Sequence, residues 1–144
     1  MAGHDVIAGY SVIALVTIAA LIQYFLMGLN VGRARGRLNV PAPATQGHPE
    51  FERLYRVQLN TLEWLVIFLP CLWLSAVLTS DLGMRATLWV AGLGVLWIIG
   101  RYIYSEAYVK DPSTRSRGFG IQALATLLLL LTSLVAAVVN LLPQ

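Results

Sequence analysis

The chain carries very little charge for its length. Only 12% of its 144 residues are charged, whereas soluble domains carry roughly 25%, and 58% are hydrophobic. A soluble core of this size could not bury so much apolar surface. We therefore predict an integral membrane protein in which residues 1–144 form one membrane domain.

Cysteine and histidine are also scarce, which excludes further classes of site. Cys71 is the one cysteine, so no intrachain disulfide can form. It lies in an apolar run without the electropositive, accessible setting of a reactive thiol, which favours an inert thiol. His4 and His48 are far apart, and no ligand cluster is found, so we expect no metal. The net charge of +3 gives no support for nucleic-acid binding.

Four apolar stretches have the length of a membrane-spanning helix, about 20 residues. They cover residues 6–29, 49–79, 84–108 and 119–142. A tight connection at residues 80–84 makes the second and third stretches antiparallel neighbours. The expected fold class is all-α, an integral membrane four-helix bundle.

The cations predict how this bundle is oriented, because Lys and Arg concentrate in cytoplasmic loops. Arg85 is the one cation in the second loop, and both termini lack Lys and Arg. The first loop, the start of the second stretch and the third loop contain Arg33, Arg35, Arg37, Arg53, Arg56, Lys110, Arg115 and Arg117. Loops one and three are therefore expected in the cytoplasm, and both termini on the opposite side.

The most informative segment opens the second stretch, at residues 50–63. Within it Arg56, Asn60 and Glu63 are spaced i, i+4, i+7 and share one helix face. An arginine, an amide and an acid suit a small zwitterionic ligand, and such groups are costly at a membrane edge, which favours a functional role. Taken alone, Arg56 could be an interfacial residue, and Glu63 could form a structural salt bridge with Arg101 or Arg56.

A second polar face lies on the third stretch, where Arg101, Tyr104 and Tyr108 share one side. Glu63 precedes Thr79 by 16 residues, and Arg101 follows Arg85 by 16, about 24 Å at ~1.5 Å per residue. Both therefore lie just inside the cytoplasmic boundary of a hydrocarbon core ~30 Å thick. The two faces should converge in one polar pocket, although the tyrosines alone would indicate an aromatic belt.

These residues resemble the MAPEG family, the membrane-associated proteins in eicosanoid and glutathione metabolism, over the whole chain. The motifs are Pro-Glu-Phe-Glu-Arg at 49–53, Arg-Val-Gln-Leu-Asn-Thr-Leu-Glu at 56–63, and Arg101 to Tyr108 followed by Arg115. The likeness is greatest to microsomal glutathione transferases and the leukotriene-C synthase branch. Trp64 replaces a tyrosine of that branch and Gly36 a second arginine, which weakens an expectation of leukotriene synthesis.

The resemblance implies a homotrimer with glutathione bound between subunits near the cytoplasmic face. One subunit would hold it through Arg56, Asn60, Glu63, Tyr104 and Tyr108, with Arg101 near the same pocket. The neighbouring subunit would contribute Arg35 and Gln58. Arg115 matches the family's catalytic arginine, which stabilises the glutathione thiolate.

The implied activity is that of a membrane glutathione transferase with a role in detoxification, and peroxidase activity is a further expectation. Glutathione is the co-substrate, and a hydrophobic electrophile or lipid hydroperoxide arrives from the membrane lipid. One alternative is a non-catalytic lipid-binding scaffold of the same superfamily, which the retained polar set disfavours. Another is a small four-helix transporter, whose key acid lies in its first helix; here no charge separates Asp5 from Arg33.

The position of Arg115 depends on how the third stretch ends. It follows Tyr108 by seven residues, so a continuous helix would bring the two roughly into line. The sequence Asp-Pro-Ser at 111–113 is a turn signal and competes with that geometry.

Overall fold

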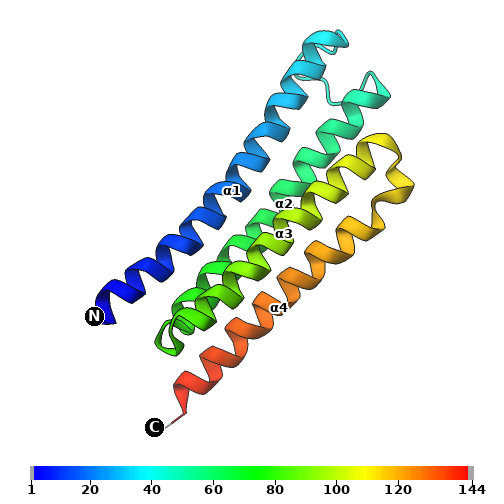
Figure 1. Cartoon of the computed structure of the whole chain (residues 1–144). Coiled ribbons are helices and arrows are strands. Elements are labelled where there is room, and N and C mark those ends of the chain that lie inside the picture. Colours follow the sequence, from blue (N-terminus) through cyan, green and yellow to red (C-terminus); the bar gives the residue numbers. More distant parts are fainter. Residues whose placement is uncertain (1, 143–144) are drawn as a thin grey trace.

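The computed structural model describes residues 2–142 as four long helices joined by short connections (Figure 1). The helices are α1 (Ala2–Arg37), α2 (Pro49–Leu78), α3 (Met84–Lys110) and α4 (Ser116–Leu141). The short 3-10 turns η1 (Ser80–Leu82) and η2 (Pro112–Arg115) link α2 to α3 and α3 to α4. All four helices are long and apolar enough to cross a membrane. The predicted all-α, four-helix membrane bundle is confirmed.

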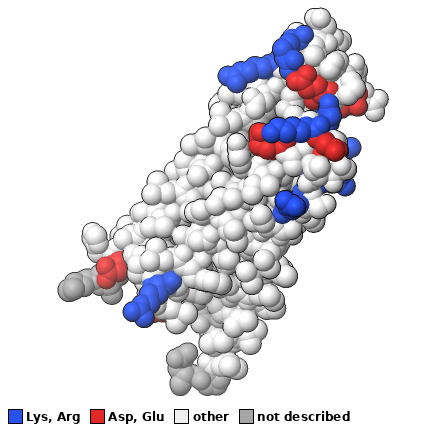
Figure 2. All heavy atoms as spheres, turned by 45° about the vertical axis from the view of Figure 1, so that its right-hand side comes forward, with Lys and Arg blue, Asp and Glu red and all other residues white. Residues whose placement is uncertain are grey.

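The two ends of the bundle differ in what they carry. The start of α1, η1 and the end of α4 lie together at one end, here called the terminal end (Figure 1). The α1–α2 connection and η2 lie at the other, here called the loop end. Charged side chains gather toward these ends, most of them at the loop end, and an uncharged belt lies between (Figure 2). Large apolar side chains are exposed on all four helices, as a lipid-facing surface requires.

The helices at the loop end extend beyond the apolar stretches. α1 continues past residue 29 to Arg37. Hydropathy predicts only the part of a helix that lies in lipid, and no proline ends this helix before Pro41. Arg37 forms a two-pronged ion pair with Glu50 in the first turn of α2. The imidazole Nδ1 of His48 caps α2 by accepting a hydrogen bond from the Glu50 N–H at 3.2 Å, and Pro49 fits the first turn. The start of α2 is therefore fixed against the end of α1.

The apolar core is centred on a parallel ring stack. Phe68 on α2 and Trp97 on α3 lie with their ring centroids 4.1 Å apart, and both are completely buried. Ile13 from α1, Leu72 from α2 and Leu129 from α4 belong to the same buried cluster. All four helices thus meet at this level.

Glycines allow α3 and α4 to approach at backbone contact. A Cβ on Gly118 of α4 would collide with the backbone of Tyr104 on α3. A Cβ on Gly100 of α3 would lie 2.7 Å from the backbone nitrogen of Gln122 on α4, closer than real Cβ atoms come. The missing side chains therefore set the separation of the two helices near the loop end.

We expect the substitution Gly118→Ala to destabilise the bundle by about 1–3 kcal/mol, the range for an overpacked contact, because α3 and α4 must move apart. Gly120→Ala is the matched control, since a Cβ there meets nothing within 4 Å. Thermal unfolding of both variants in detergent measures the difference. Equal melting temperatures would show that Gly118 does not limit the approach of the helices.

Candidate polar site at the loop end

The α2 face predicted from the motif is present and faces outward from the bundle. Arg56 and Glu63 are exposed, and Asn60 between them is half-buried. The amide Nδ2 of Asn60 donates to Oε2 of Glu63 at 3.2 Å. Among residues 2–142 the carboxylate of Glu63 has no ion-pair partner, so the alternative of a structural salt bridge is not formed within one subunit.

Arg101 on α3 is the buried centre of this region, with no exposed surface. Its Nε donates to Oγ1 of Thr61 at 2.9 Å, and its Nη1 donates to Oε1 of Gln122 at 2.7 Å. Its Nη2 donates to Oδ1 of Asn60 at 3.0 Å and to the carbonyl oxygen of Val57 at 3.4 Å. All these acceptors are uncharged. The guanidinium is therefore bound to the predicted α2 face through Asn60 rather than through Glu63.

Consecutive contacts between aromatic rings and guanidinium groups connect Arg101 to Arg115 through Tyr104 and Tyr108. The Arg101 Cζ lies 4.2 Å from the ring centroid of Tyr104, which is also buried. The rings of Tyr104 and Tyr108 are 5.5 Å apart, and Cζ of Arg115 lies 5.7 Å from the Tyr108 ring. Both contacts are within the range of a cation–π attraction. Tyr104 and Tyr108 thus connect the buried arginine to an exposed one.

Arg115 reaches Tyr108 by a chain reversal and not by a continuous helix. α3 ends at Lys110, where Asp111 accepts a hydrogen bond on Oδ1 from the Ser113 N–H at 2.9 Å. That backbone hydrogen bond lowers the pKa of the Asp111 carboxyl below its ordinary value. The turn η2 then returns the chain, and Nη1 of Arg115 donates to the Pro112 carbonyl at 2.7 Å. The turn signal in the sequence therefore prevails over helix continuation.

A polar pocket of about 440 Å³ lies at the loop end between the α1–α2 connection, the start of α2 and Tyr108 of α3. Its lining includes Arg53 and Arg56 on α2 and Tyr108 on α3, together with Glu52 and Tyr55. The Nη1 of Arg53 donates to the carbonyl of Lys110 at 3.3 Å, which joins the two helices here. Two guanidinium groups beside a phenol suit the carboxylates of a small polar ligand.

A model of the MAPEG family matches residues 13–135, which contain all of these side chains. The chain belongs to the MAPEG family. An uncharacterized protein of Synechocystis sp. is 40% identical over 123 residues, 85% of this chain and 85% of that protein. Microsomal glutathione S-transferase 2 of Homo sapiens is 35% identical over 132 residues, 89% of this chain and 82% of that protein. Leukotriene C4 synthase of Mus musculus is 29% identical over 133 residues, 92% of this chain and 85% of that protein.

In this MAPEG protein Arg35 lies in the last turn of α1, and its side chain contacts the α1–α2 connection rather than Asn60 and Glu63 of its own subunit. Its Nη1 donates to three backbone carbonyls of that connection, and its Cζ lies 4.7 Å from the ring centroid of Phe51. Gln58 is half-buried on α2, close to Gly28 of α1. A contribution of Arg35 and Gln58 to a site on another subunit stays a prediction.

Two residues of the polar site were not predicted from the sequence. Thr61 lies within the 56–63 motif, directly after Asn60, and the structure shows that it is fully buried. Gln122 is the one glutamine of a mostly apolar helix, which is a signal by itself because polar groups are costly in lipid. Its partner could not be predicted, because nothing in the residue spacing shows that α4 meets Arg101.

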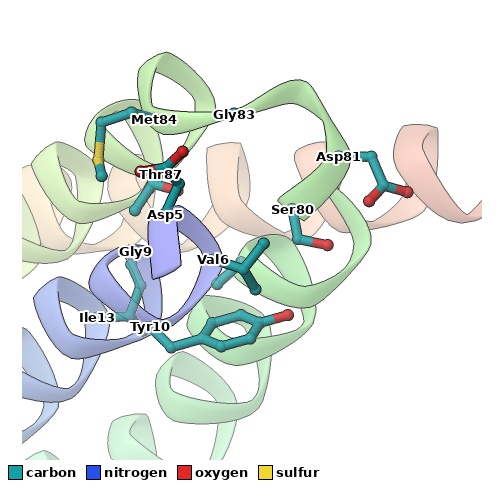
Figure 3. Close-up of a pocket in the computed structure, with 11 residues that line it drawn as sticks. Asp5, Val6, Gly9, Tyr10, Ile13, Ser80, Asp81, Gly83, Met84 and Thr87 are labelled. Atoms are coloured by element: carbon teal, nitrogen blue, oxygen red, sulfur yellow. The ribbon is translucent and has the colours of Figure 1, made fainter. Parts of the chain in front are cut away.

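A second pocket of about 280 Å³ lies at the terminal end, and the charged residues that line it are acidic rather than basic. It is lined by the start of α1, the end of α2, the α2–α3 turn and the start of α3, and the ring of Tyr10 extends from α1 toward α2 (Figure 3). Asp5, Asp81 and Thr87 are among its lining residues, and no arginine or lysine lines it. None of the predicted site residues lies there. The described residues contain no group of three or more side chains that could hold a metal ion.

Proposed function

We propose that this protein is a membrane glutathione transferase that joins the glutathione thiolate to hydrophobic electrophiles from the bilayer, with peroxidase activity toward lipid hydroperoxides. The observation that carries the proposal is the outward-facing set of Arg56, Asn60 and Glu63, in which Asn60 is hydrogen-bonded to both Glu63 and the buried Arg101. The relatives named microsomal glutathione S-transferase 2 and leukotriene C4 synthase support the same chemistry.

The chemical groups of glutathione match the groups on this face. Its two carboxylates suit the guanidinium groups of Arg53 and Arg56 beside the 440 Å³ pocket. Its ammonium suits Glu63, whose carboxylate has no cationic partner among residues 2–142. Asn60 and the hydroxyls of Tyr104 and Tyr108 offer hydrogen bonds to the peptide part. The set thus provides a partner for each charged group of the tripeptide.

The polar face also argues for assembly. An exposed acid within the hydrocarbon region costs about 2.5–3.5 kcal/mol on insertion scales, and Glu63 is exposed in a single subunit. A homotrimer covers this face with a neighbouring copy, which contributes Arg35 and Gln58 to the shared site. The loop end then faces the cytoplasm, because most cations lie there.

Arg115 is the proposed catalytic group. It contacts the ring of Tyr108 and is exposed. A permanent cation beside the thiol stabilises the thiolate. The thiolate sulfur forms a bond to the electrophilic carbon, and the leaving group departs with the electron pair. The thiol proton passes to water.

Isothermal titration of the detergent-purified protein with glutathione tests the proposal. We expect saturable binding, weakened by roughly 1.5–3 kcal/mol in Glu63→Gln, the range for a hydrogen bond to a charged group. Glu106→Gln is the control, because Glu106 pairs with Lys110 on the surface of α3 at 3.9 Å. It should bind as the wild type does. Absence of saturable binding by the wild type at millimolar glutathione would end the transferase proposal.

Native mass spectrometry from mild detergent is expected to show a trimer, because a site shared between subunits requires a neighbouring copy. Glutathione should add to the trimer and not to dissociated subunits. A monomer or dimer that still binds glutathione with the affinity of the intact sample would contradict the shared site.

The substitution Arg115→Ala is expected to lower turnover of a model electrophile on the order of tenfold, since a nearby opposite charge shifts a pKa by about 1–3 units. Without the cation the thiol pKa rises, so the deficit should shrink as the pH is raised. Glutathione affinity should change little, and the ultraviolet absorbance of bound thiolate should fall. Arg117→Ala is the control, exposed two residues away with the same loss of charge. Equal turnover and thiolate signal in Arg115→Ala would remove Arg115 from the mechanism.

A further inference from the structure

Gln122 is buried in α4 and makes the shortest hydrogen bond that Arg101 has. Its side chain has no exposed surface, and its Oε1 accepts from Nη1 of Arg101 at 2.7 Å. It is the contact that ties α4 to the buried guanidinium. The close approach permitted by Gly100 and Gly118 places the Gln122 backbone against α3, so the amide can span the remaining distance.

Arg101 in turn fixes which way the Asn60 amide points. Nη2 of Arg101 donates to Oδ1 of Asn60 at 3.0 Å, so the amide oxygen faces the cation. The NH₂ group of Asn60 must then face away, and its Nδ2 donates to Oε2 of Glu63 at 3.2 Å. Hydrogen bonds in such a chain polarise one another. A chain of three hydrogen bonds therefore links an acceptor on α4 to an exposed carboxylate on α2.

We propose that Gln122 is a positioning residue, which acts through Arg101 and Asn60 to hold Glu63 toward the ammonium of a thiol tripeptide. The positioning of Asn60 stands on the geometry alone, whereas its effect on ligand affinity rests on the proposed function. The competing interpretation is that Gln122 only satisfies a buried cation. In that case its loss lowers stability without reorienting Asn60.

The two halves of the Gln122 amide separate these interpretations. Its oxygen bonds Arg101, while its Nε2 has no hydrogen-bond partner among the described residues. Gln122→Glu keeps an oxygen acceptor at the same place and removes the unpartnered donor, while adding an acid beside the Arg101 guanidinium. Gln122→Leu has similar volume and removes the acceptor. Ser133→Ala is the matched control, because it removes another buried α4–α2 contact, the bond to Ser75, without touching Arg101.

Nitrogen-15 spectra of the full chain in detergent test the positioning directly. The side-chain NH₂ of Asn60 and the Nε–H of Arg101 are assigned with single substitutions. We expect both signals to shift in Gln122→Leu, and the Asn60 signal to stay near its wild-type position in Gln122→Glu and Ser133→Ala. An unchanged Asn60 signal in Gln122→Leu overturns the proposal. If Gln122→Leu does not fold, Gln122→Met, which replaces the amide oxygen with a much weaker acceptor, takes its place.

Glutathione titration tests the consequence for affinity. Gln122→Leu should bind about tenfold more weakly, a loss of about 1.4 kcal/mol, and Gln122→Glu within about threefold of wild type. In a Glu63→Gln background the Gln122→Leu substitution should have no further effect. An equal loss with and without Glu63 would overturn the link to that carboxylate. Failure of the wild type to bind glutathione would end the proposed function, and the spectra would still decide the positioning of Asn60.

Discussion

The arrangement of the loop end depends on one buried cation that is satisfied without a counter-ion. Moving a guanidinium out of water costs several kcal/mol unless its donors are bonded. Arg101 meets this requirement with uncharged acceptors from α2 and α4, so that three helices converge on one group. The carboxylate that joins this network at the surface, Glu63, has no ion-pair partner in the part of the chain that the structure describes. A direct salt bridge would have consumed the acid that the proposed ligand needs.

Small residues make this convergence possible. The Arg101 guanidinium can donate hydrogen bonds to both α2 and α4 only if the backbones of α3 and α4 come into contact. Gly100 and Gly118 permit that approach. The stacked rings of Phe68 and Trp97 hold the bundle together farther from the loop end. Packing in the apolar middle and polar contacts at the loop end thus act at different levels of the same bundle.

Much of this arrangement is predictable from sequence because it depends on local periodicity. Hydropathy gives the four helices, and helical spacing puts Arg56, Asn60 and Glu63 on one face. It does not give the end of α1, since a helix continues into water as long as no residue breaks it. Local periodicity does not predict the contact between Gln122 and Arg101 either. Which residue of α4 meets Arg101 depends on how two helices are rotated against each other, and that is a property of tertiary packing.

Tyr104 has a consequence for how the site responds to its solvent. Its ring covers the Arg101 guanidinium on one side, and both residues are buried. Dissolved ions screen exposed charges over about 10 Å at moderate ionic strength, but they act much less on charges buried in protein. Arg56, which is exposed, feels that screening fully. Raising the ionic strength therefore weakens the attraction between Arg56 and an anionic group. The interaction of the buried Arg101 with Asn60 is affected much less, so the orientation of Asn60 persists in salt.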